Sequence, residues 1–357
     1  MALELLERSP ADVFSERVMQ IVNDGALALM ISIGHRTGLF DVMAAMPPAS
    51  ATGIAEAAHL SERYVREWLG AMVTGDIVRY DPPSNTYSLP AEHADSLTRA
   101  ASPNNMAVTA QWLPLLGGVE NAIVEAFVHG RGVPYSAYPR FHDVMAEESQ
   151  QTVVAGLFDH ILPLVPGIEA RLEAGIEVLD VACGSGRAMI AMARQYPASR
   201  FTGIDFSAEA VSAGNADVAR RRLPNVRFVQ GDVAELDQAQ AYDLVTAFDA
   251  IHDQARPAEV LARIRAALRP GGTLLMQDIA GHTRVEDNRD HPLGPFLYTI
   301  SCLHCMSVSL AAGGPGLGAM WGREQALEML AASGFERVSV ESLPHDPINY
   351  YYVADAQ

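Results

Sequence analysis

Lysine is absent from this chain of 357 residues, so all 25 basic side chains are arginine. The absence excludes chemistry that depends on a lysine amine. A pyridoxal-phosphate enzyme or a lysine-type aldolase needs a lysine Schiff base. A P-loop NTPase needs the Walker lysine, and a protein kinase needs the lysine that pairs with phosphates. A genome that favours arginine codons explains the bias, but the exclusions hold whatever its origin.

Cysteine and positive charge are also scarce. The three cysteines, Cys183, Cys302 and Cys305, are too few for a disulfide framework, which favours a reducing, cytoplasmic location. Acidic residues outnumber basic ones by 43 to 25, and the net charge of −18 disfavours nucleic acid as a partner. Cys302 and Cys305 form one ligand pair without a second, so we predict no metal site.

Long hydrophobic runs are missing as well. The longest apolar stretch, Gly25 to Gly34, is about half of the roughly 20 residues that a membrane span needs. We therefore expect a buried helix there and no membrane association. The first residues, Met1 to Glu16, lack the basic and apolar regions of a signal peptide. Hydrophobic residues make up 49% of the chain, and its length favours two domains.

The two halves of the chain differ in pattern. Residues 1–165 follow the helical period, whereas short apolar runs alternate with helical segments in residues 166–357. The runs predict strands at 177–182, 200–204, 226–230, 243–248, 273–278, 337–342 and 349–353. Alternating strands and helices indicate an α/β, Rossmann-like doubly wound sheet of seven strands. The short link between the last two strands predicts an antiparallel hairpin.

The first half contains the pattern of a winged helix. Thr52 and Ser61 are candidate caps for helices at 53–58 and 62–73, and strands are expected at 76–80 and 86–89. Residues 51–90 carry three arginines and five acidic side chains, a net charge of −2. Because phosphate contacts dominate DNA affinity, an acidic face binds DNA poorly. We expect this domain to form a homodimer and to cap a substrate pocket. A transcriptional regulator that binds a nucleoside as effector is the alternative.

A glycine loop opens the second half. The run Val178-Leu-Asp-Val-Ala-Cys-Gly-Ser-Gly-Arg187 places Gly184, Ser185 and Gly186 between a strand and a helix. Glycine allows a sharp turn and a close approach to a ligand, and the helix N-terminus offers free N–H groups. Met189 stands where a dinucleotide fingerprint has its third small residue. An NAD-dependent oxidoreductase is therefore the weaker alternative.

Three carboxylates are predicted around one crevice. Asp180 lies on the first strand of the second half, Asp205 ends the second, and Asp232 follows the third. Asp205 comes 21 residues after Gly184, the spacing at which an acidic residue binds ribose hydroxyls. Ligands of open α/β sheets bind at the carboxyl ends of the strands. Three carboxylates there suit a cationic nucleoside better than a diphosphate.

Together these motifs resemble a class I S-adenosylmethionine-dependent methyltransferase. The matching segments are 179–186, Gly203-Ile-Asp205, Gly231-Asp232, 242–248 and Leu268-Arg-Pro-Gly-Gly272. With the winged helix in front, the chain resembles small-molecule methyltransferases that dimerise through that domain. The resemblance implies a donor site with the following roles. Gly184, Ser185 and Gly186 would lie against the amino-acid part, with Asp180 nearby, and Asp205 would bind the ribose. Phe206, Asp232 and Val233 would hold the adenine, and Phe248 and Asp249 would face the sulfonium.

The acceptor is expected to be a small organic molecule methylated at oxygen or nitrogen. A base near the transferred methyl would assist, and His252 and His304 are the candidate catalytic residues. Residues 281–322 are long for a connection between a strand and a helix, which is typical of a segment that covers a substrate. Tyr138, Phe141, His142 and Met145 are further candidates to cover the donor or the acceptor.

Overall fold

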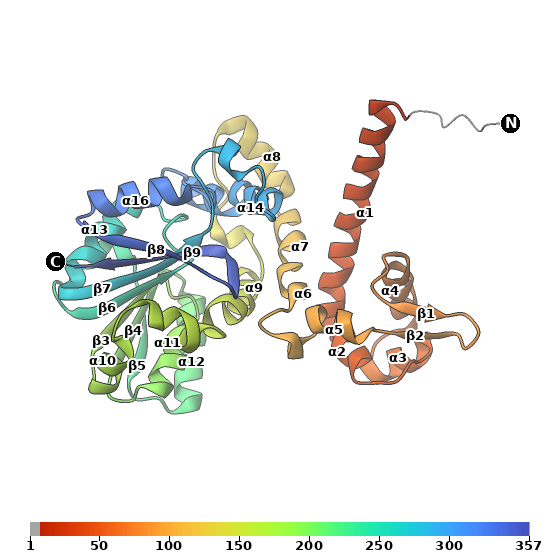
Figure 1. Ribbon diagram of the computed structural model, residues 1–357, viewed down its shortest axis with the longest axis horizontal. Helices are drawn as coiled ribbons and strands as arrows, with labels where there is room; N and C mark the ends of the chain where they lie inside the picture. Colours follow the sequence, from red (N-terminus) through yellow and green to blue (C-terminus); the bar gives the residue numbers. More distant parts are fainter. Residues whose placement is uncertain (1–7, 357) are drawn as a thin grey trace. The chain divides into compact units, whose positions relative to one another are not determined.

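The computed structural model describes residues 8–356 and divides into two compact units, Met1–Pro114 and Leu115–Gln357 (Figure 1). Residues 1–7, which include the start of the predicted N-terminal domain, lie outside the described residues. Residues 115–165, which the sequence pattern grouped with the first half, belong to the second unit. Each unit is described by itself.

The first unit contains the predicted winged helix. Helices α3 (Ala51–Ala58) and α4 (Glu62–Thr74) precede the two-stranded sheet of β1 (Arg79–Asp81) and β2 (Thr86–Ser88). The predicted cap Thr52 is wrong, because Ser50 caps α3 by accepting a hydrogen bond from the Gly53 N–H at 3.2 Å. The other elements are α2 (Leu39–Ala44), α5 (Ala91–Leu97), η1 (Arg99–Ala101), α6 (Met106–Thr109) and α7 (Trp112–Gly117), which crosses into the second unit.

Helix α1 (Pro10–Thr37) differs from the expectation of a buried helix. It begins with a capping box between Ser9 and Asp12 and ends at Gly38, whose φ of 74° is left-handed. Its buried residues are Ser32, Gly34 and His35 only. Large apolar side chains project from the rest of the helix, at Val13, Phe14, Val18, Met19, Ile21, Val22, Leu29 and Ile33. The predicted burial is therefore wrong, because periodicity identifies an apolar face but not what covers it.

Two segments pass a simple test for membrane-spanning helices by length and composition. They are Pro10–Thr37 and Gly294–Ala311. In the most apolar 18 residues of each segment, 17% and 44% of the residues are buried, respectively. The second is broken into α14 (Gly294–Ile300), the π-helical turn η8 (Ser301–Cys305) and α15 (Met306–Ala311). Core helices of globular proteins can have the same length and apolar composition.

The second unit contains the predicted seven-stranded sheet. The strands are β3 (Glu177–Val181), β4 (Arg200–Asp205), β5 (Val226–Gln230), β6 (Tyr242–Phe248), β7 (Leu268–Ile279), β8 (Val338–Leu343) and β9 (Asp346–Asp355). Their order is β5-β4-β3-β6-β7-β9-β8. The first five are parallel, and β9 pairs antiparallel with both β7 and β8. The predicted fold class and the antiparallel last hairpin are confirmed.

Helices cover both faces of this sheet, because alternate residues of each buried strand point to opposite sides. Val178 of β3 packs in one core with α10 (Ile168–Ala174), α11 (Arg187–Gln195) and α12 (Ala208–Arg221). Leu179, the next residue, packs in the other core with α13 (Pro257–Ala267) and α16 (Gly322–Ala332). The crossover connections therefore leave the carboxyl ends of the parallel strands open at one edge.

Two further segments of the second unit consist of short helices. The first contains α8 (Glu120–His129), η2 (Tyr135–Ala137), α9 (Phe141–Ser149), η3 (Gln150–Val154), η4 (Leu157–Ile161) and η5 (Leu162–Leu164). The second is the predicted insertion 281–322, with η7 (Val285–Asn288), α14, η8 and α15. They contact each other, because the Tyr138 hydroxyl donates to the Leu303 carbonyl and the Val133 N–H donates to Ser307 Oγ at 2.8 Å. The turn η6 (Val233–Glu235) follows β5.

Candidate active site

Two adjoining cavities lie at the carboxyl ends of the parallel strands. Counting the space that is open to solvent, their volumes are about 890 Å³ and 720 Å³, and both are lined by Tyr135, Ala182, Phe206, Asp253 and Gln254. The structure brings together all ten residues that the sequence placed in the donor site. The larger cavity is lined by Asp180, Gly184, Ser185, Gly186, Asp205, Phe206, Phe248 and Asp249, and the smaller one by Phe206, Asp232 and Val233.

The glycine loop forms one wall of the larger cavity. Gly184 and Gly186 have φ values of +54° and +69°, which other residues rarely adopt. A Cβ on Gly186 would lie 2.0 Å from the Phe228 ring, so the loop can pack against the sheet only with glycine there. The space around a Cβ on Gly184 is open. The loop therefore presents bare backbone to the cavity, directly before the N-terminus of α11.

Asp205 fixes the glycine loop to the end of β4. Its Oδ2 accepts a hydrogen bond from the Gly184 N–H and its Oδ1 accepts one from the Ser207 N–H, both at 2.8 Å. Burial raises the pKa of its carboxyl, and these backbone hydrogen bonds oppose the rise. Each carboxylate oxygen has a second lone pair, so the group retains capacity to accept from a ligand.

Asp180 lies beneath the loop, where burial raises its pKa to about 7. The Thr246 hydroxyl donates to Asp180 Oδ1 at 2.6 Å and partly offsets that rise. The residue is 3% exposed, and the charge of Asp205 also raises its pKa. The carboxyl is therefore poised to ionise when a positive group enters the cavity.

The smaller cavity combines an aromatic ring with a fixed carboxylate. Phe206 is 49% exposed, and its ring centroid lies 5.0 Å from that of Tyr135. Asp232 Oδ1 accepts from the Ala234 N–H at 2.8 Å, and its Oδ2 accepts from Arg256 Nη2 at 2.8 Å. Arg256 also contacts Glu235 at 2.7 Å. The carboxylate is thus held in one orientation at the rim of the cavity.

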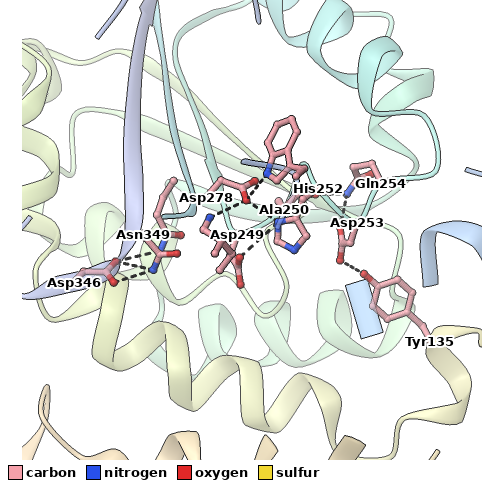
Figure 2. A network of polar contacts seen from close by, with 12 residues as sticks. Tyr135, Asp249, Ala250, His252, Asp253, Gln254, Asp278, Asp346 and Asn349 are labelled. Carbon is pink, nitrogen blue, oxygen red and sulfur yellow. Dashed lines mark hydrogen bonds and ion pairs between the residues drawn. The ribbon is translucent and has the colours of Figure 1, made fainter. Parts of the chain in front are cut away.

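A buried polar network follows β6 and β7, and Figure 2 shows its members. His252 Nδ1 lies 2.8 Å from Asp278 Oδ1 and 3.8 Å from Asp249 Oδ1. Trp321 Nε1 also donates to Asp278 Oδ1, at 3.0 Å. The negative charge of Asp278 raises the pKa of His252 against the opposing effect of burial. Asp249 has a φ of 53°, and such strain in a residue other than glycine is common at functional sites.

The two predicted catalytic histidines lie just outside the cavity linings. His252 is 2% exposed, while its neighbours Asp249 and Asp253 line the larger cavity. His304 is stacked on Phe141 with the ring centroids 4.3 Å apart and is flanked by Tyr135 and Tyr138. Burial lowers the pKa of His304 to about 3. His304 therefore stays neutral within an aromatic cluster.

Some lining residues are not predictable from local sequence patterns. Tyr135 lines both cavities, and its hydroxyl donates to Asp253 (Figure 2). Arg256 lines the smaller cavity and holds Asp232. Tyr135 is 118 residues away from Asp253 in the chain, and no local pattern joins the two. Phe141, His142 and Met145, which the sequence predicts as a cover, line the larger cavity, whereas Tyr138 does not line it and contacts the His304 ring.

Two segments of the chain match known protein families. Residues 172–307 match the family described as a methyltransferase domain, and residues 25–99 match the Rv2258c-like winged HTH domain. The chain therefore contains a methyltransferase domain, preceded by a winged-helix domain. The matched segment of the methyltransferase domain contains the glycine loop, Asp205, Asp232 and His252, so the family match and the cavities coincide.

Curated relatives of the methyltransferase domain include trans-aconitate 2-methyltransferase of Deinococcus radiodurans. It is 34% identical over 117 residues, which are 33% of this chain and 42% of that protein. The malonyl-[acyl-carrier protein] O-methyltransferase of Halalkalibacterium halodurans is 29% identical over 30% of this chain and 41% of its own length. The chain thus matches less than half of the length of these relatives, and their acceptors are not transferred to it.

Solved structures match over nearly the whole chain at low identity. A putative O-methyltransferase from Nostoc punctiforme has a TM-score of 0.72 at 20% identity, covering 98% of this chain and 99% of its own. Human N-acetylserotonin methyltransferase, solved with S-adenosylmethionine, gives the same TM-score and coverage at 18% identity. At such identity the likeness shows the fold of the methyltransferase domain and its winged helix.

Proposed function

We propose that the chain transfers a methyl group from S-adenosylmethionine to a small organic acceptor, at oxygen or nitrogen. One observation carries the proposal: the residues expected to bind the donor line two adjoining cavities at the carboxyl ends of the sheet. The bare backbone at Gly184 leaves room for the amino-acid part, and the exposed ring of Phe206 offers a face for the adenine. Buried carboxylates suit the positive charges of this donor.

When bound, the donor supplies a methyl group that is already activated by its sulfonium. The residues of the chain bind and orient it: Asp205 through the ribose hydroxyls, Asp232 through the adenine amino group, and the loop through backbone N–H groups. Positioning and exclusion of water then provide most of the acceleration. The acceptor atom forms a bond to the methyl carbon as the carbon–sulfur bond breaks, and the acceptor must lose its proton.

For that proton we propose His252 rather than His304. Asp278 stabilises the imidazolium of His252, which makes the neutral imidazole a stronger base. His304, with a pKa of about 3, is a weak base. Tyr135, Phe141 and His304 instead form an aromatic wall that excludes water.

Calorimetry with S-adenosylhomocysteine and with NAD tests the proposal. We expect one molecule of S-adenosylhomocysteine to bind per chain and NAD to bind at least about a hundredfold more weakly, because Met189 is buried where a dinucleotide fold needs a small residue. The Asp205→Ala variant should lose this binding, whereas Asp217→Ala on α12, outside both cavities, should retain it. Binding of NAD without S-adenosylhomocysteine would overturn the assignment.

We also propose that the chain is a homodimer and works in the cytoplasm. The exposed apolar face of α1 is large for a surface that contacts only water. The same face on a second copy of the chain could pack against it and bury both. Three free cysteines suit a reducing compartment. Light scattering should give a molecular mass twice that of one chain. In the double variant Phe14→Glu, Val22→Glu the measured mass should fall to that of a single chain. An unchanged mass in that variant would exclude α1 from the interface.

A DNA-binding regulator is the second candidate function, favoured only by the winged helix. On α4, Arg66 pairs with Glu62 at 2.8 Å and Arg63 pairs with Glu67. The two arginines of the predicted recognition helix are thus neutralised within the helix itself, which leaves little charge for phosphates. A gel shift with a salt titration tests this candidate, and strong sequence-specific binding would revive it.

A further inference from the structure

Apolar side chains and carboxylates both line the larger cavity. Phe141 and Met145 of α9, with Val153 and Val154 of η3, supply apolar surface. Asp249 and Asp253, which follow β6, supply two of the carboxylates, and Asp253 also lines the smaller cavity. Because Asp180 and Asp205 lie at the glycine loop, an acceptor in the larger cavity would meet Asp249 and Asp253.

The charges of the cavity do not balance. Four carboxylates line it, and Arg187 is the sole arginine among its described lining residues. Arg187 begins α11 beside the glycine loop and donates to the Ala146 carbonyl at 2.7 Å, far along the chain from Asp249 and Asp253. Asp180 is bound by Thr246, and Asp205 by two backbone N–H groups. Among the described residues of this cavity wall, no arginine pairs with Asp249 or Asp253, and Asp253 accepts a hydrogen bond from the Tyr135 hydroxyl.

The buried groups behind that wall do not remove the imbalance. His252 lies 3.8 Å from Asp249, but it is closer to Asp278, at 2.8 Å. Asp346, further along the network in Figure 2, adds another carboxylate to the same region. Burial raises the pKa of both Asp249 and Asp253 to about 6, and the charge of His252 opposes that rise. Asp249 Oδ1 is buried and has no hydrogen-bond partner within residues 8–356.

We propose that the methyl acceptor is an uncharged or cationic molecule with an apolar body, and that the cavity rejects acceptors that carry a carboxylate. The inference rests on the proposed methyl transfer and narrows its substrate class. The sulfonium of the donor offsets one negative charge, and the second carboxylate still repels an anion. The Asp249 side chain is 29% exposed, so its outer carboxylate oxygen can accept a hydrogen bond from an amine or hydroxyl of the acceptor. A tricarboxylate such as trans-aconitate, the acceptor of some relatives, is thereby excluded.

Three phenols that share a ring and differ in charge test the proposal. They are tyramine as the cation, 4-hydroxybenzyl alcohol as the neutral molecule and 3-(4-hydroxyphenyl)propionate as the anion. Calorimetry on the full chain saturated with S-adenosylhomocysteine should rank tyramine first and the anion last, at least about tenfold apart. In the Asp249→Asn, Asp253→Asn double variant the ratio of the cation's affinity to the anion's should fall toward one. Asp217→Asn on α12 should leave it unchanged.

The outcomes separate this inference from the proposed function. Failure of S-adenosylhomocysteine to bind, measured first, would refute the donor site. With the donor site confirmed, equal or tighter binding of the anion, or of trans-aconitate, would overturn the acceptor class. An unchanged ratio in the double variant would show that these carboxylates do not select the acceptor. Binding of none of the phenols at millimolar concentration would also count against the proposal.

Discussion

Replacing Asp205 by alanine is the sharpest perturbation of the donor site. The wild-type carboxylate accepts hydrogen bonds from the N–H groups of Gly184 and Ser207, both at 2.8 Å, and is proposed to accept two more from the ribose hydroxyls. Hydrogen bonds to a charged group contribute about 1.5–3 kcal/mol each. Loss of the two ribose bonds alone should weaken binding of S-adenosylhomocysteine by about 3–6 kcal/mol, or roughly 10² to 10⁴-fold.

The assay is calorimetric titration with S-adenosylhomocysteine, combined with thermal unfolding to confirm that the variant is folded. Asp205→Asn provides an intermediate case, because its amide oxygen retains one acceptor for Gly184 while the negative charge is lost. Asp217→Ala is the matched control, since Asp217 is an aspartate of the same unit that pairs with Arg220 and Arg221 outside the cavities. A folded Asp205→Ala variant that binds within about tenfold of the wild type would refute the reasoning.

Three further predictions concern proton equilibria and packing. In the Asp278→Asn variant, His252 loses the neighbouring negative charge that raises its pKa. The acidic limb of the pH profile of kcat should therefore move to lower pH. If this limb stays at the wild-type pH, His252 is not the catalytic base. The raised pKa of Asp180 means that the folded protein without donor holds a proton that the unfolded chain releases, so stability should fall as pH rises from about 4 to about 7. That slope should flatten in Asp180→Asn, as thermal unfolding across this range would show. Gly186→Ala should lower the free energy of unfolding by about 2 kcal/mol or more, because φ is +69° and the new Cβ meets the Phe228 ring; a change below about 0.5 kcal/mol in urea unfolding would contradict this.

The sequence predicts the centre of the sheet well because the central strands are buried on both faces. Such strands appear as largely apolar runs between turn residues, and Glu177–Val181 and Tyr242–Phe248 are examples. The donor site is predictable for a related reason. Its residues follow the strands directly, and parallel strands place their carboxyl ends at one edge whatever the details of packing.

The rest of the site depends on contacts between distant segments. Tyr135 reaches Asp253 across 118 residues, and Arg256 reaches Asp232 across 24, without any periodic signal. The exposure of α1 also escaped prediction. Its apolar residues are those expected of a core helix. Whether they are buried depends on the surfaces that pack against them, and the sequence of this segment does not identify those surfaces.

The most direct test of the central claim is a crystal structure of the complex with S-adenosylhomocysteine. We expect electron density for the adenine in the smaller cavity, beside Phe206 and Asp232. The ribose should lie on Asp205, and the sulfur should lie in the larger cavity, facing Phe248 and Asp249. Density for the ligand elsewhere on the chain, with neither cavity occupied, would show that the proposed donor site is wrong.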